Sequence, residues 1–84
     1  GSLGSAVQYD GELLPALKND VLIASEEGRG ILRLRPDESG TRLVATEWML
    51  RDRIGGVRLI ATAADGVIYV CTADAVGRIV PGPR

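Results

Sequence analysis

The sequence of 84 residues contains no histidine and a single cysteine, Cys71. Without histidine the chain lacks the commonest general base, the usual Ser–His and Cys–His nucleophile pairs, and imidazole metal ligands. One cysteine excludes both an intramolecular disulfide and a zinc–cysteine cluster. No apolar run reaches the roughly 18 residues that a membrane helix needs, and no signal-peptide pattern is visible. We therefore expect neither histidine-dependent catalysis nor a membrane partner.

An excess of charge of either sign is also missing, because ten basic and eleven acidic side chains leave a net charge of −1. This balance argues against a nucleic-acid partner, which would require a basic surface, and against a polybasic membrane surface. Apolar residues nevertheless make up 45% of the chain, which indicates a folded protein. A chain of this length forms one small domain, with a free energy of unfolding of about 5–8 kcal/mol.

Three segments can be distinguished along the chain. Residues 1–6, rich in glycine and serine, are expected to be a flexible leader or a cloning remnant. Residues 82–84 follow Pro81 and form a tail, since proline continues neither a helix nor a central strand. Residues 7–81 are therefore the expected folded unit.

The folded unit has the pattern of an all-β protein. Val21–Ala24 is a short apolar run between polar turns, and residues 29–35 alternate between polar and apolar side chains. Residues 12–18 contain Pro15 and are too short for a stable helix, so we expect a loop or one helical turn there. Seven strands are predicted in all, at residues 7–9, 21–24, 29–35, 42–50, 56–63, 67–72 and 78–80.

An internal repeat indicates how these strands are grouped. The sequence Asp20–Ser25 is echoed by Gly66–Cys71, and the glycine–arginine pair at Gly28 is echoed by the pair at Gly77. The offset is 46 residues at the first strand and 49 at the glycines, which indicates three inserted residues between the strands. Repeats of roughly 40–50 residues with four strands are typical of β-propeller blades. Because a blade packs on its neighbours through both faces, two blades alone leave apolar faces uncovered.

Four segments follow one another along the chain. They are residues 9–25, which begin Tyr-Asp-Gly-Glu-Leu-Leu-Pro, residues 28–34 (Gly-Arg-Gly-Ile-Leu-Arg-Leu), residues 50–57 (Leu-Arg-Asp-Arg-Ile-Gly-Gly-Val), and residues 64–74, which begin Ala-Asp-Gly-Val-Ile-Tyr-Val. Their order and spacing over residues 7–81 resemble the soluble glucose/sorbosone (aldose sugar) dehydrogenases, although Leu14 stands where that family has an aromatic residue. The resemblance implies a six-bladed β-propeller, of which this chain would supply two four-stranded antiparallel blades. It also implies pyrroloquinoline quinone (PQQ) and calcium as cofactors, and a histidine base in the oxidation of sugars.

The motif that helps to hold the quinone is incomplete in this chain. In the resembled family, two arginines of an Arg-Ile-Arg-Asp motif bind the quinone carboxylates, for which a guanidinium fork is well suited. Here Arg53 falls on the first arginine position, but Gly55 and Gly56 occupy the positions of the second arginine and the aspartate. Arg53 is therefore the candidate cofactor-binding residue; alternatively, it lies in a solvated turn beside Asp52. No catalytic residue is assigned, and we expect neither a bound cofactor nor dehydrogenase activity from this chain alone.

Other chemically notable residues have simpler explanations. Cys71 lies in the most apolar strand and is expected to be a buried, inert side chain. Trp48 and Tyr69 are expected to pack between sheets, although Trp48 alternatively marks a subunit contact. The acidic residues at 10–12, 26–27 and 37–38 lie in turn-like stretches without the spacing of a calcium loop, so no metal site is predicted.

We expect a non-catalytic, self-assembling module in which three copies of a two-blade unit complete a six-bladed ring. Because seven strands are predicted where two blades need eight, a terminal strand is expected to pair with a neighbouring copy. In such a ring Arg53 recurs around the axis and forms a pocket for a small anion or a sugar. Two alternatives stay open: a part of a PQQ- and calcium-dependent sugar dehydrogenase that needs further blades, and a small monomeric β adaptor that takes partner peptides at its edges. The resemblance favours an extracytoplasmic bacterial location.

Overall fold

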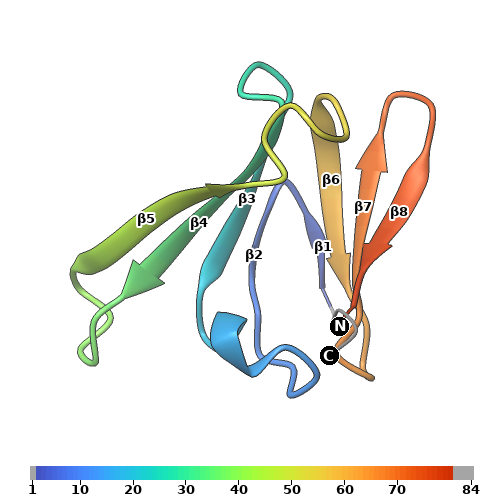
Figure 1. The fold of residues 1–84 in the computed structure, drawn as a ribbon. Helices are drawn as coiled ribbons and strands as arrows, with labels where there is room; N and C mark the ends of the chain where they lie inside the picture. The colour runs from blue at the N-terminus through green and yellow to red at the C-terminus, as the bar shows by residue number, and fades with distance from the viewer. Residues whose placement is uncertain (1, 81–84) are drawn as a thin grey trace.

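A computed structural model describes residues 2–80, so the expected tail at 82–84 lies outside the described residues. The order of elements along the chain is shown in Figure 1. Within the described range these elements are β1 Ser2–Gly4, β2 Ala6–Gln8, the 3-10 helix η1 Pro15–Leu17, β3 Val21–Ser25, β4 Gly30–Pro36, β5 Leu43–Met49, β6 Val57–Thr62, β7 Ile68–Thr72 and β8 Val76–Ile79.

The strands form two antiparallel four-stranded sheets, in the orders β2-β3-β4-β5 and β1-β6-β7-β8. We call them the first and the second sheet. The all-β class is thus confirmed, and the seven predicted strands correspond to β2 through β8. The helical turn expected within residues 12–18 is η1, which begins at Pro15, because proline fixes a helical backbone angle where no N–H is needed.

Strand β1 occupies residues that we expected to belong to a flexible leader. Leu3 lies opposite Ala61 of β6, and the pairing extends over Ser2–Gly4. The backbone N–H and C=O groups on this edge of β6 would otherwise lack a protein partner, so β1 satisfies them. The eighth strand therefore comes from the same chain, and the strand count no longer requires one from a neighbouring copy.

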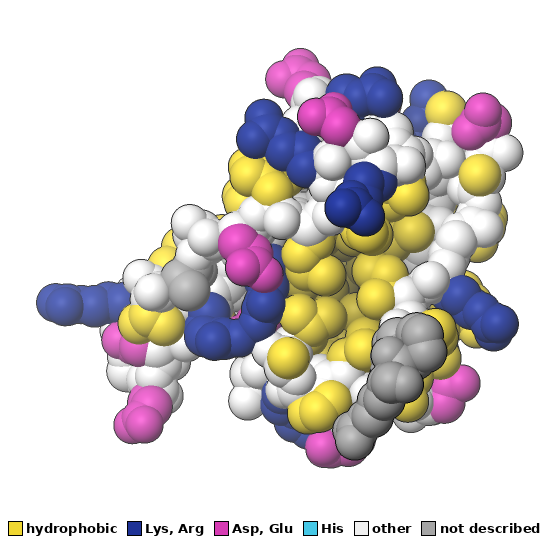
Figure 2. All heavy atoms as spheres, viewed as in Figure 1, with side chains coloured by type: hydrophobic (Ala, Val, Ile, Leu, Met, Phe, Trp, Pro, Cys, Tyr) yellow, Lys and Arg dark blue, Asp and Glu magenta, His cyan; other side chains and the backbone are white. Residues whose placement is uncertain are grey.

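The hydrophobic core lies between the two sheets. Opposite residues of an antiparallel pair share a face, so Val7 and Leu22 point together towards the second sheet, from which Ile60 and Val70 point back. Each fully buried aliphatic side chain of this kind stabilises the fold by about 1.5–3 kcal/mol. Hydrophobic side chains also gather in the hollow between the two sheets that Figure 2 shows, with charged side chains around it. The buried members of the core are Val7, Tyr9, Leu17, Leu22, Ile31, Val57, Ile60, Ile68 and Val70.

The two copies of the internal repeat turn equivalent faces towards each other. Leu22 corresponds to Ile68 in the repeat, and both are fully buried between the sheets. In a ring of blades related by rotation about one axis, the second blade would instead turn its opposite face to the first. The packing of β2-β3-β4 on β6-β7-β8 is therefore that of a two-layer sandwich.

The register of the hairpins corrects one detail of the repeat. Ala24 pairs with Ile31 in the first sheet, and Val70 pairs with Gly77 in the second. Both hairpins thus have the same spacing, and the three inserted residues inferred between the strands are not present in the pairing. The three inserted residues were inferred by matching the glycine–arginine pair at Gly28 with the pair at Gly77. These two pairs do not occupy equivalent positions in the two sheets.

Tyr9 connects the two sheets at the end where β2 leaves the first sheet. It is completely buried, and its hydroxyl donates to the carbonyl of Gly66 at 2.5 Å. The same hydroxyl accepts a hydrogen bond from the N–H of Leu14 at 3.2 Å. A Cβ on Gly11 would lie 2.6 Å from this hydroxyl, so only glycine allows the β2–β3 loop to approach so closely. The Tyr-x-Gly sequence thus fastens this loop to the β6–β7 turn.

Candidate functional site

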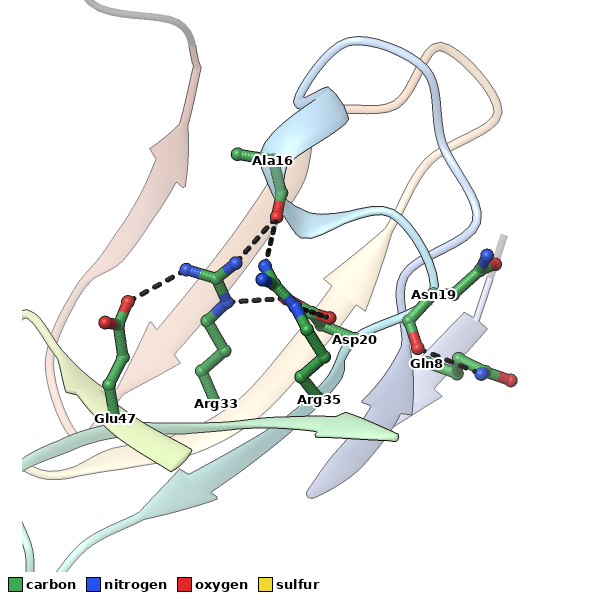
Figure 3. A network of polar contacts seen from close by, with 7 residues as sticks. All are labelled: Gln8, Ala16, Asn19, Asp20, Arg33, Arg35 and Glu47. Atoms are coloured by element: carbon green, nitrogen blue, oxygen red, sulfur yellow. Dashed lines mark hydrogen bonds and ion pairs between the residues drawn. The ribbon is translucent and has the colours of Figure 1, made fainter. Parts of the chain in front are cut away.

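A buried carboxylate, Asp20, organises the polar residues at one end of the first sheet. Asp20 immediately precedes β3 and is only 1% exposed. The two-residue alternation of β4 places Arg33 and Arg35 on the same face, towards Asp20. The Nε of Arg33 donates to Asp20 Oδ2 at 2.5 Å, and the Nε of Arg35 donates to Asp20 Oδ1 at 3.2 Å (Figure 3). One carboxylate therefore holds two guanidinium groups side by side.

A backbone carbonyl and a second carboxylate complete this network. The Ala16 carbonyl of η1 accepts from Nη2 of Arg33 at 2.6 Å and from Nη2 of Arg35 at 3.0 Å. Glu47 lies opposite Arg33 in the β4–β5 register and accepts from its Nη1 at 2.8 Å. The network thus links η1, β3, β4 and β5, which fixes the position of the β2–β3 loop on the sheet.

The electrostatic environment keeps Asp20 ionised. Burial raises the pKa of Asp20, whereas the hydrogen bonds from Arg35 and Arg33 lower it. The lowering outweighs the effect of burial, so the pKa lies below its ordinary value of 3.8. The hydrogen bond to Asp20 in turn raises the pKa of Arg33. A carboxylate held in this way does not exchange protons near neutral pH, so the network is suited to positioning and not to acid–base catalysis.

An open cavity of about 420 Å³ lies beside this network, between the β2–β3 loop and the β4–β5 turn. Asp37 belongs to this turn, and a hydrogen bond from Ser39 at 2.7 Å lowers the pKa of its carboxyl group. The cavity therefore combines charged side chains of both signs with backbone of two loops. Its lining consists of Gln8, Lys18, Asn19, Asp20, Arg35, Pro36 and residues 37–40.

Arg53, the candidate cofactor-binding residue, lies at the opposite end of the first sheet, in the β5–β6 loop (Figure 1). It is exposed, and its backbone N–H donates to the Leu50 carbonyl at 3.1 Å. The lining of the 420 Å³ cavity does not include it. Because a single exposed guanidinium is accompanied by glycines at 55 and 56, this loop does not fit a quinone with several carboxylates.

The other arginines near this loop already have partners. The N–H of Asp52 donates to the Arg29 carbonyl at 2.9 Å, and the Nε of Arg29 lies 3.1 Å from Asp52 Oδ1. The guanidinium of Arg51 stacks over Trp48 at 4.9 Å from the ring centroid. Among residues 2–80, no second arginine therefore takes the place of the one that the motif lacks.

The aromatic and cysteine predictions need correction. Trp48 is 39% exposed on the outer face of the first sheet, and Tyr69 is half-buried on the outer face of the second. The aromatic side chain between the sheets is Tyr9 instead. Cys71 is half-buried on the same outer face as Tyr69, and not fully buried. In strands that are apolar on both faces, alternation does not tell which face meets the partner sheet.

Residues 2–80 offer neither a metal site nor a membrane-spanning helix. No group of three or more His, Cys, Asp or Glu side chains in this range could hold a metal ion. None of its helices has the length and apolar character needed to cross a membrane.

The sequence interpretation missed the Asp20 network and the cavity beside it. A signal was present, because an acidic residue directly before an apolar strand and two arginines spaced by two on the next strand can meet in a hairpin. The contribution of Ala16 had no such signal, since a backbone carbonyl depends on the path of its loop.

Comparison with curated proteins and with solved structures gives no match. Comparison with protein families gives a match to Glucose / Sorbosone dehydrogenase over residues 2–81. This match spans almost the whole sequence and includes residues 7–81, over which the resemblance was found. The chain therefore belongs to the glucose/sorbosone dehydrogenase family.

Proposed function

We propose that this chain is a non-catalytic, self-assembling module of the sugar-dehydrogenase type, in which the outer faces of the two sheets dock onto further copies. The observation that carries this proposal is that the packing between the sheets buries one face of each and leaves the other, largely apolar, face uncovered. Contiguous exposed apolar surface of this kind is typical of interaction sites.

The outer face of the first sheet is defined by side chains that alternate with the core. Leu32 lies between Ile23 of β3 and Trp48 of β5 in the register, so these three form one apolar row. Val21 and Leu34 form the next row, which extends the surface along the strands. None of these five residues is fully buried.

The outer face of the second sheet is similar in character. Leu59 pairs with Cys71, and Cys71 pairs with Val76, which gives an apolar row across β6, β7 and β8. Val76 is 72% exposed and Leu59 is 40% exposed. Leu3 extends this face onto β1, opposite Ala61.

The two outer faces belong to different sheets, so a contact between them is heterologous. Such a contact repeats from copy to copy and either closes into a ring or grows into a filament. A six-layered ring, the number of blades implied by the family resemblance, needs three copies. Each copy would then present Arg53 at the same end of the ring, where the repeated guanidinium groups would form a small-anion or sugar pocket.

The sequence of this chain supports the non-catalytic role. It contains no histidine to act as the family's base, and the quinone motif retains only Arg53 beside Gly55 and Gly56. The family in general depends on PQQ, and its match over residues 2–81 supports a second candidate, in which this chain is part of a quinone- and calcium-dependent dehydrogenase that requires further blades. Addition of PQQ and calcium to the pure chain should change neither its melting temperature nor the quinone absorbance; a shift in either would favour this candidate.

A monomeric adaptor is the third candidate, and the sandwich packing favours it. Equivalent faces of the repeat close a core within one chain, so the fold does not depend on a neighbour for its interior. The strands at the sheet edges could then pair with extended peptides of a partner.

The solution mass, measured by light scattering during size-exclusion chromatography over a dilution series, separates these candidates. A discrete trimer supports the ring, whereas a folded monomer at all concentrations contradicts it and supports the adaptor. The variant Leu59→Glu, which introduces a charge on the second outer face, should shift the trimer to monomer. Ile54→Glu is the matched control, because Ile54 is exposed to a similar extent (36% against 40%) but lies in the β5–β6 loop.

A further inference from the structure

We propose that the cavity between the β2–β3 loop and the β4–β5 turn binds a small zwitterion of the size and charge of a free amino acid. The cavity is formed by residues of a single copy and lies at the opposite end of the first sheet from Arg53. The proposal is therefore independent of the assembly proposed above. A volume of about 420 Å³ falls within the range of roughly 300–1,000 Å³ that small-molecule pockets have.

The basic part of the cavity is a guanidinium group that is already fixed in position. Nε and Nη2 of Arg35 are held by Asp20 and by the Ala16 carbonyl, as Figure 3 shows. Its Nη1 has no partner among residues 2–80, and 47% of the side chain is exposed. A group held in this way loses little conformational freedom on binding, so Arg35 is preorganised to donate to a carboxylate.

Polar groups of the β2–β3 loop face the same space. Lys18 is anchored by the Glu12 carboxylate and the Asp10 carbonyl, and its ammonium group is partly exposed. The side-chain amide of Asn19 has no hydrogen-bond partner in the described part of the chain. Together with Arg35 these groups offer unused hydrogen-bond donors to an anionic group.

The acidic part of the cavity is the β4–β5 turn. The carboxylate of Asp37 accepts a hydrogen bond from Ser39, which fixes its orientation, and Glu38 next to it is exposed. Both residues line the cavity, and neither forms an ion pair with another residue of 2–80. They are therefore available to a cationic group of a ligand.

The combination of charges selects the ligand class. A simple anion would meet Arg35 favourably but would be repelled by Asp37 and Glu38, and a simple cation would have the reverse problem. A neutral sugar would leave Asp37 and Glu38 without a counter-charge. A ligand whose ammonium and carboxylate groups are joined through a single carbon atom carries both charges, so its carboxylate can lie at Arg35 while its ammonium lies at the turn.

Two-dimensional NMR of the ¹⁵N-labelled chain tests this assignment with four probes. We expect L-serine to shift the amide signals of Asn19 and of residues 37–40 in a saturable manner. N-acetyl-L-serine lacks the ammonium group and L-serinamide lacks the carboxylate, so each should bind at least tenfold more weakly. D-glucose should cause no saturable shift. Equal shifts with glucose, or serine shifts that do not saturate, would overturn the proposal.

Variants keep the test separate from stability. Glu38 lies on an exposed turn, so Glu38→Gln should leave the fold intact. It should weaken serine binding about threefold, because it removes one exposed charge pair. Arg35→Lys retains the charge but loses the fork, and should weaken binding about tenfold. Arg53→Gln, at the other end of the sheet, is the matched control and should bind serine like the original chain. Unchanged binding in both Glu38→Gln and Arg35→Lys, with intact spectra, contradicts the site, whatever the solution mass of the protein.

Discussion

Tyr9 is the residue whose side chain joins the two sheets most directly. Its ring lies in the core. Its hydroxyl donates a hydrogen bond to Gly66 in the β6–β7 turn and accepts one from Leu14 in the β2–β3 loop. Both partners are backbone groups, so the Tyr9 hydroxyl is the only side-chain group in these two hydrogen bonds. The aromatic hydroxyl is therefore the part of this contact that mutation can remove cleanly.

We expect Tyr9→Phe to lower the free energy of unfolding by about 1–3 kcal/mol, because it leaves a buried carbonyl and an N–H without their partner while the ring remains. Urea unfolding followed by circular dichroism measures this loss. Tyr69→Phe is the matched control and should change stability by less than about 0.5 kcal/mol, since Tyr69 is half-buried on the outer face. Equal losses in the two variants would contradict the role of Tyr9.

The carboxylate of Asp20 gives the fold a dependence on acid. Because its pKa is lower in the folded state than its ordinary value of 3.8, its stabilising contribution is complete above about pH 5 and is lost as the pH falls through the folded-state pKa. The free energy of unfolding, measured by urea titration from pH 7 to pH 3, should therefore fall below about pH 4. In Asp20→Asn this part of the fall should disappear, and stability at pH 7 should drop by about 2–4 kcal/mol, because two guanidinium groups lose their carboxylate.

A control is needed because the pKa of Asp37 is also lowered. Asp37→Asn should keep most of the acid dependence, since Asp37 lies on a turn, where Ser39 and backbone N–H groups bond to its carboxylate, and forms no ion pair with a guanidinium group of residues 2–80. If Asp37→Asn removes the fall and Asp20→Asn preserves it, the assignment to the buried network is wrong.

At the level of elements, the two sheets are held together by loops as well as by the core. The β2–β3 loop lies against the β6–β7 turn, where Gly66 has a φ of 89° and sits between Leu13 and Tyr9. Gly40, in the β4–β5 turn, has a similar φ of 76° but has open space around the position of a Cβ. Substitution of Gly40 by alanine therefore changes only the backbone preference, whereas substitution of Gly66 also crowds two neighbouring elements. Comparison of the two variants gives the free energy cost of the crowding.

We expect Gly40→Ala to cost about 1–2 kcal/mol, the penalty of a left-handed conformation for an L-residue. Gly66→Ala should cost at least about 1 kcal/mol more, because its Cβ would lie 2.8 Å from the Cβ of Leu13. Urea unfolding of both variants measures the difference. Identical losses would mean that the β2–β3 loop can move away from the β6–β7 turn without a cost.

At the level of the whole molecule, the uncovered outer faces decide how the protein behaves in solution. Cys71 reports on one of them, because its half-buried thiol lies between Leu59 and Val76 on the outer face of the second sheet. If copies dock there, this thiol becomes inaccessible in the assembly.

The reaction of Cys71 with an aromatic disulfide reagent should therefore slow down as protein concentration increases, by tenfold or more between the dilute and the assembled state. Absorbance of the released thiolate measures the rate. Leu59→Glu should abolish the dependence on concentration, whereas Ile54→Glu should retain it. A rate that is independent of concentration in the original chain would contradict docking through this face.

The sequence by itself determined the strands of this protein and their grouping into two repeats. Apolar runs between turn residues located β2 through β8, since strand formation and turn formation depend on residues close together in the chain. The motif order likewise determined the family. Arg53 was identified as a candidate by its position in a motif, and that position is a property of the sequence alone.

Only the tertiary structure decided which faces of the strands meet. Strand β1 was not recognised, because a Ser-Leu-Gly segment forms a strand only when the free edge of β6 is beside it. Strand β3 is apolar on both faces, so its sequence does not determine whether Leu22 or Ile23 points to the core. The packing of the two sheets buries Leu22. The Asp20 network and its cavity depend on this same choice, since it brings η1, β3, β4 and β5 together from distant parts of the sequence.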